Sequence, residues 1–140
     1  MAMTRMRASA ACLLVAVCWG SVPAAAGSFD GKTTLICSVS HVLGCVDDEH
    51  CLHGRARTFD LPDFMIVDFA KKVVRQVGES GNASVSPIRT QESTGTQLVL
   101  QGIENGHGWS MAIHRDHGRM RTVAVGEELS FSIFGACTPR

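Results

Sequence analysis

The sequence predicts an all-β protein, a small antiparallel meander of about eight strands that closes into a barrel-like sheet with two disulfides. Two observations carry this prediction. Apolar and polar residues alternate with a period of two in several short segments, as in half-buried strands. Turn signals recur about every 8–12 residues, and no segment shows a convincing helical repeat.

The N-terminus has the composition of a secretory signal peptide. Two arginines precede an apolar run over Ala8–Gly20, which is shorter than the about 20 residues that a membrane-spanning helix needs. Ala24 and Ala26 occupy the small-residue positions before a cleavage site. We therefore expect a signal peptide over residues 1–26 and export to the periplasm or the medium. A short membrane anchor is the alternative.

Residues 27–140 are expected to form a single exported β domain. This part keeps all 13 acidic residues of the chain and 11 of its 13 basic ones, so it is nearly neutral. A strongly basic face is not implied, and we expect no nucleic-acid partner. No second apolar run is long enough for a membrane span.

Four cysteines remain in the expected domain, and an even number in a small exported domain predicts a disulfide framework. Four cysteines allow three pairings. Cys37 and Cys137 lie on the more apolar faces of the first and last predicted strands, TTLICSVSH and LSFSIFGACT. If these strands are neighbours in a closed sheet, the two cysteines can pair across the seam. Cys45 and Cys51 are then left to close a short loop.

The segment GCVDDEHCLHG is the densest in reactive side chains. We expect a stapled loop with a polar rim that forms a candidate binding surface: Asp47, Asp48, Glu49, His50 and His53. Zinc is the alternative, held by both cysteines and both histidines, although the five residues between the cysteines exceed the usual spacing. A redox dithiol lacks the C-x-x-C pattern.

The other strands follow in order. Asp63–Ala70 and Lys71–Val77 read as a hairpin, and Gly78–Ser84 as a loop. Pro87 predicts that the next strand lies at an edge. Gly102, within the strand Gln97–Glu104, is expected to mark a bulge or bend.

Asn-Gly at Asn105 predicts a tight hairpin, and the turns Asp116–Gly118 and Gly126–Glu128 separate the last strands. The side chains that face inward by alternation are expected to fill the barrel as its core: Leu35, Val39, Leu98, Leu100, Trp109, Met111, Ile113, Phe131 and Ile133.

Signals of catalysis are weak. No serine lies in G-x-S-x-G, and no pair of carboxylates is singled out. His107 and His114 are too far apart along one strand to share a ligand, whereas His114 and His117 can meet across their turn. We therefore expect no catalytic residue, no cofactor and no enzyme.

The segments PDFMIVDFAKK, LVLQGIENGHGWSMAIHRDHGRM and SIFGACTP resemble small exported proteins of Proteobacteria that share a C-terminal FGACTP segment. The resemblance implies a bacterial exported setting and brings no activity or site residue. In size and class the chain is also similar to periplasmic lysozyme-inhibitor barrels.

The function expected from the sequence is non-catalytic binding of a protein partner through the surface, in the manner of an inhibitor. Two alternatives remain. The barrel can carry a small apolar ligand, or a metal-binding or catalytic site can lie around His50 and His53.

Overall fold

The structure is a computed structural model that describes residues 29–47, 49–77 and 84–140. The signal peptide expected over residues 1–26, with Ala24 and Ala26, lies outside the described residues, as does Asp48. Nine strands lie within the described ranges: β1 (Leu35–Cys45), β2 (Cys51–Gly54), β3 (Phe64–Asp68), β4 (Val73–Val77), β5 (Val85–Ser93), β6 (Gln97–Glu104), β7 (His107–His114), β8 (Arg119–Val125) and β9 (Ser130–Pro139).

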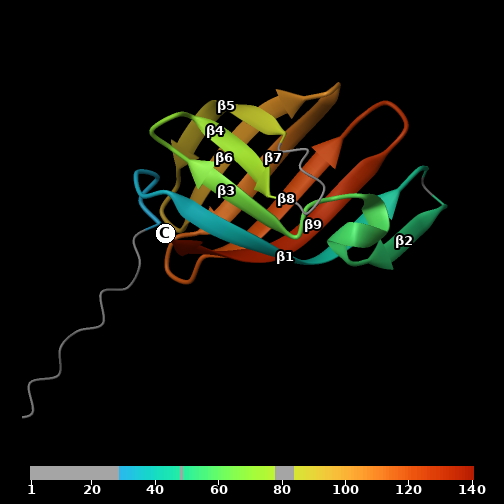
Figure 1. The fold of residues 1–140 in the computed structure, drawn as a ribbon, viewed down its shortest axis with the longest axis horizontal. Coiled ribbons are helices and arrows are strands. Elements are labelled where there is room, and N and C mark those ends of the chain that lie inside the picture. The colour runs from blue at the N-terminus through green and yellow to red at the C-terminus, as the bar shows by residue number, and fades with distance from the viewer. Residues whose placement is uncertain (1–28, 48, 78–83) are drawn as a thin grey trace, which may run out of the picture.

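Eight of these strands form a closed antiparallel barrel (Figure 1). Their order is β1-β3-β4-β5-β6-β7-β8-β9, and β9 pairs with β1 to complete the circle. Among the described residues, the short strand β2 pairs only with the C-terminal half of β1, and it lies outside the barrel. The predicted barrel-like all-β fold is therefore confirmed, with one outer strand added.

The seam between β1 and β9 extends over the whole of β1, from Leu35 to Cys45, with a bulge between Val39 and His41. Cys37 lies directly opposite Cys137 in this register, and the two are joined by a disulfide. Cys45 likewise lies opposite Cys51, between β1 and β2, and forms the second disulfide. Both pairings are those that the sequence favoured.

The predicted hairpins have the expected turns. The β3–β4 turn is held by Asp68, whose Oδ1 accepts the Lys71 backbone N–H at 3.0 Å. Asn105 and Gly106 form the two-residue turn between β6 and β7 with φ angles of 48° and 79°. Positive φ at both central residues is what Asn-Gly tolerates and what this tight turn requires.

Two expectations need correction. β5 is not an edge strand, because residues 85–87 pair with β4 and the residues from Ile88 onward pair with β6. Pro87 lies where the partner changes, so its missing N–H interrupts no continuous ladder. The segment GCVDDEHCLHG is not one loop either, since its second half forms β2.

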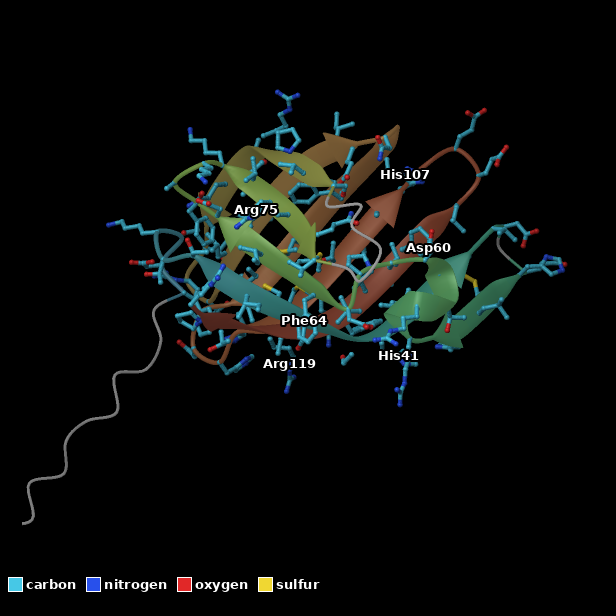
Figure 2. The ribbon with its side chains drawn as sticks, viewed as in Figure 1. His41, Asp60, Phe64, Arg75, His107 and Arg119 are labelled. Carbon is cyan, nitrogen blue, oxygen red and sulfur yellow. A yellow bond between two sulfur atoms is a disulfide. The ribbon has the colours of Figure 1, made fainter. Side chains whose placement is uncertain are left out.

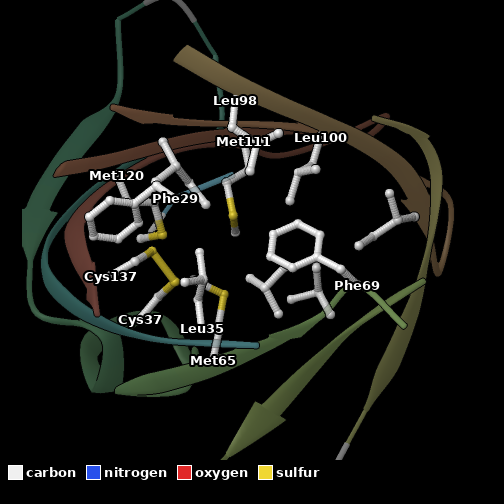
Figure 3. Packing of buried hydrophobic residues seen from close by; sticks show 14 of the residues in the cluster. Phe29, Leu35, Cys37, Met65, Phe69, Leu98, Leu100, Met111, Met120 and Cys137 are labelled. Atoms are coloured by element: carbon white, nitrogen blue, oxygen red, sulfur yellow. A yellow bond between two sulfur atoms is a disulfide. The ribbon is translucent and has the colours of Figure 1, made fainter. Parts of the chain in front are cut away.

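One half of the barrel interior is packed with apolar side chains (Figure 3). Phe29, ahead of β1, contributes to this end, together with Leu35, Leu98, Met120 and the Cys37–Cys137 disulfide. All nine residues expected to face inward belong to this core or pack against it; Val39, Trp109 and Phe131 are only half-buried. In the part of the chain that the structure describes, no helix is long and apolar enough to cross a membrane.

The two disulfides should differ in their effect on stability. Replacing Cys37 and Cys137 together by alanine should lower the free energy of unfolding by about 4–5 kcal/mol, because this bridge closes a loop of about 100 residues. The same change at Cys45 and Cys51, six residues apart, should cost about 2–3 kcal/mol. Guanidinium unfolding of both variants measures the difference, and an equal or reversed order would contradict it.

Candidate functional site

The end of the barrel opposite the packed core holds an open cavity of about 590 Å³. Side chains of β3–β9 line it, together with the segment from Arg57 to Asp63. The sequence favoured an interior filled by side chains. The structure instead leaves the half nearest the β6–β7 turn unfilled, so this expectation holds for only one end of the barrel.

Rows of neighbouring residues on β7, β8 and β9 explain where the packing stops. Ile113 pairs with Met120, and Met120 with Gly135, in the packed core. One row closer to the opening, Thr122 lies between Met111 and Ile133. These three residues line the floor of the cavity.

The next row forms the aromatic wall, in which Ala124 lies between Trp109 and Phe131. Ala124 is too small to fill the space between two aromatic side chains on the neighbouring strands. The cavity therefore follows from a small residue in a row where its neighbours are large.

Trp109 is held in place from two sides. Its indole Nε1–H donates to Ser86 Oγ at 2.7 Å, which fixes the ring against β5. On the other side the ring covers Gly102, its direct neighbour on β6, where a Cβ would lie within 3.0 Å of the indole. The glycine predicted to mark a bend thus makes room for the indole, next to a bulge in β5 between Ile88 and Thr90.

Few polar side chains lie deep in the described lining of the cavity. Thr122 is 6% exposed, and its Oγ1 has no hydrogen-bond partner among the described residues. Ser86 is 3% exposed and accepts the indole hydrogen bond, which leaves its own hydroxyl hydrogen available as a donor. Both side chains line the cavity.

The rim of the cavity carries most of its charge. Asp60 and His107 lie at this end of the barrel (Figure 2). The Arg57 guanidinium donates to Asp63 at 2.8 Å. Glu104 adds a third carboxylate, so the described lining residues hold three carboxylates and one guanidinium. His107 Nδ1 donates to the backbone oxygen of Asn105 at 3.1 Å, leaving Nε2 as an acceptor when the ring is neutral.

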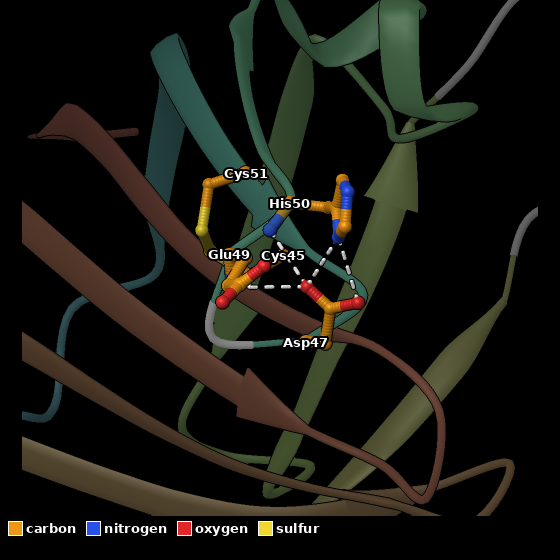
Figure 4. The surroundings of a disulfide bond; sticks show 5 residues. All are labelled: Cys45, Asp47, Glu49, His50 and Cys51. Carbon is orange, nitrogen blue, oxygen red and sulfur yellow. Dashed lines mark hydrogen bonds and ion pairs between the residues drawn. A yellow bond between two sulfur atoms is a disulfide. The ribbon is translucent and has the colours of Figure 1, made fainter.

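The stapled loop connects β1 to the outer strand β2 (Figure 4). None of its described residues lines the cavity. The His50 Nδ1–H donates to both oxygens of Asp47 at 2.8 Å, and the backbone N–H groups of Glu49 and His50 donate to Asp47 Oδ1. These hydrogen bonds, that of the His50 side chain first, lower the pKa of Asp47 below its ordinary value. The loop is thus held together by hydrogen bonds from its own residues to Asp47.

Four of the six histidines form two pairs. His53 does not join His50; its Nδ1 lies 3.3 Å from Nε2 of His41 on β1. His114 and His117 meet across their turn as expected, with ring centroids 3.8 Å apart. The Cys45–Cys51 disulfide takes up both thiolates that the zinc alternative needs. Over residues 29–47, 49–77 and 84–140, no three or more histidine, cysteine or acidic side chains are grouped to hold a metal ion.

Sequence reasoning named Trp109, Met111, Phe131 and Ile133 as inward residues but missed the polar ones, Thr122 and Ser86. The alternation in RMRTVAV does place Thr122 on the same face as Met120. A threonine on an inward-facing position of this strand could have indicated a polar residue inside the barrel.

Replacing Gly102 by alanine should displace Trp109 and destabilise the protein by about 1–3 kcal/mol, since the added Cβ would clash with the indole and with the Pro87 carbonyl oxygen. Trp109 is the only tryptophan within residues 27–140, so its fluorescence reports the change in a protein produced from residue 27 onward. Gly108→Ala is the matched control, because nothing lies within 4 Å of its added Cβ. Equal effects of the two substitutions would refute this packing.

Asp47 should titrate below its ordinary pKa, and His50→Ala should move that pKa back up. Because the native pKa is lowered, the stabilisation from ionised Asp47 is present above the unfolded value. It disappears as the pH falls below about 4 and through the native pKa. Carboxyl-carbon NMR titration measures both proteins. An ordinary Asp47 pKa in the unmutated protein would contradict the hydrogen-bonded loop.

No family model, curated protein or solved structure matches this chain. The function must therefore be inferred from the geometry of the barrel itself.

Proposed function

We propose that the protein is an exported, non-catalytic carrier that binds a small, mainly apolar molecule in the open end of its barrel. The cavity of about 590 Å³ is the observation that supports this proposal. Pockets for small ligands have volumes of roughly 300–1,000 Å³, and an eight-stranded barrel has room for one small ligand.

The chemistry of the lining supports binding. Met111, Ile133, Trp109 and Phe131 supply apolar surface, and a few polar groups converge on the same space. This combination is typical of ligand pockets, where apolar contacts give affinity and polar groups fix orientation. Among the described lining residues, no serine or threonine hydroxyl is hydrogen-bonded to a histidine or a carboxylate, so no activated nucleophile is assembled.

Export is part of the proposal. The N-terminal pattern of residues 1–26 suits a secretory signal, and two disulfides are compatible with an oxidising compartment. A periplasmic or secreted carrier would meet its ligand outside the cytoplasm.

A protein partner at the outer strand is the second candidate. Val46 and Leu52 flank the Cys45–Cys51 disulfide and are 62% and 68% exposed. β2 pairs on one side only, so its other edge can accept a strand from a partner. We place this candidate second because exposed apolar side chains also occur on surfaces without a partner.

Ala124→Phe should weaken ligand binding strongly, because the new ring would occupy the space between Trp109 and Phe131. The probe is N-phenyl-1-naphthylamine, an uncharged apolar dye whose fluorescence rises in apolar surroundings. The unmutated protein should bind it with a stoichiometry of one, and Ala124→Phe should weaken binding at least tenfold.

Ala136→Phe is the matched control, since Ala136 is exposed on the outside of β9. It should bind the dye as the unmutated protein does. Carrier function would be rejected if no dye bound to the folded protein, or if both substitutions weakened binding equally.

A further inference from the structure

The outer wall of the barrel has a depression of about 380 Å³ beside the β7–β8 turn. Its lining residues on β7 and β8 alternate with the buried Met111, Ile113 and Met120, so they lie on the outside of the barrel. The described lining consists of two histidines, two arginines, one glutamine and one alanine: Gln97, Ala112, His114, His117, Arg119 and Arg121. None of these residues lines the interior cavity. We call this depression the outer basic site.

The small side chain of Ala112 accounts for the hollow. Ala112 lies directly opposite Arg121 on β8 and opposite Val99 on β6. Gln97 lies opposite His114 two residues further along the same pair of strands. A methyl group among longer side chains on neighbouring strands leaves room on the wall for a small chemical group.

The two histidines present hydrogen-bond donors to this space. His114 Nδ1 accepts the backbone N–H of Asp116 at 3.3 Å, and His117 Nδ1 accepts the backbone N–H of Arg119 at 3.2 Å. A ring nitrogen that accepts a hydrogen bond carries no proton, so each neutral ring holds its proton on Nε2. The rings stack with their centroids 3.8 Å apart, which brings both Nε2–H donors to the same part of the wall.

The two arginines supply positive charge that the described parts of the chain do not neutralise. Both are exposed, and neither forms an ion pair with a described carboxylate. The Arg121 guanidinium lies 5.9 Å from the centroid of the Phe134 ring, a contact that uses its flat face and leaves its N–H groups free. Asp116, in the β7–β8 turn, does not line the depression, and Glu92 lies three strands from Arg121 in the same row.

We infer that the outer basic site binds the phosphate group of an anionic ligand, independently of the interior cavity. The two guanidinium groups match the nearly two negative charges of a phosphate monoester, and each can donate two parallel hydrogen bonds to it. The Nε2–H groups of the histidines supply donors for its remaining oxygens. A carboxylate has one charge and two oxygens, so it uses fewer of these donors. A metal cation is repelled by both guanidinium groups.

The test is a titration of the isotope-labelled protein with inorganic phosphate, followed by ¹H–¹⁵N NMR at constant ionic strength and at about pH 8, where histidine is ordinarily neutral. Phosphate should shift the Nε signals of Arg119 and Arg121 to saturation, and acetate should bind at least tenfold more weakly. Long-range ¹H–¹⁵N spectra should show that His114 and His117 both carry their proton on Nε2.

Substitutions separate this site from the general charge of the protein. Arg119→Gln and Arg121→Gln should each weaken phosphate binding about fivefold, because each removes one charge-assisted contact at an exposed site. Arg89→Gln is the matched control, since Arg89 is an exposed arginine on β5 that does not line the depression. It removes the same charge and should leave the affinity unchanged.

A second arm distinguishes a free phosphomonoester from a lipid headgroup. A headgroup ligand should make the unmutated protein, but not Arg121→Gln, sediment with phosphatidylcholine vesicles that contain phosphatidic acid. Binding of phenyl phosphate without such sedimentation would identify a free phosphomonoester.

Three results would overturn the inference. Phosphate would bind no better than acetate, Arg89→Gln would weaken binding as much as Arg121→Gln, or both histidines would carry their proton on Nδ1. Each of these results leaves the carrier function standing, because binding of the apolar dye tests the interior cavity separately.

Discussion

Cys37 and Cys137 lie 100 residues apart in the chain, yet they face each other across β1 and β9. This seam turns a meander into a closed barrel, because every other neighbouring pair of barrel strands follows in order along the chain, with β1 and β3 linked through β2. Closing the circle gives every barrel strand a neighbour on both sides and gives the interior a fixed circumference. The disulfide restricts the unfolded chain over almost the whole domain and so favours the closed form.

Side chains have to fill the interior of a barrel of fixed circumference, and here they fill it unevenly. At one end Phe29, Leu98, Met120 and the disulfide pack together. At the other end Ala124 leaves space between Trp109 and Phe131, and Gly102 makes room for the Trp109 indole. The packed end stabilises the barrel, whereas the open end holds a cavity. In its lining, the Trp109 indole N–H donates to Ser86 Oγ. Stability and binding thus depend on different residues of one interior.

Local patterns were enough to predict most of the barrel strands, the Asn-Gly hairpin and, through the faces of Cys37 and Cys137, the closing seam, but not the outer strand β2. They were not enough for features that depend on which strands become neighbours. Pro87 suggested an edge strand, because the sequence does not show that β5 changes its partner from β4 to β6 at this residue. The cavity depends on Ala124 lying between Trp109 and Phe131 across three strands, a register that no single segment reveals. His53 likewise meets His41 only once β2 is paired with β1.

Locating a bound probe in the barrel tests the central claim most directly. The measurement is the set of intermolecular nuclear Overhauser effects between N-phenyl-1-naphthylamine and the isotope-labelled protein in solution. A ligand in the open end should give contacts from the naphthalene protons to the Met111 methyl group and the Trp109 indole. Contacts confined to the outer surface, for example to exposed Val123 or Phe134, would contradict the account.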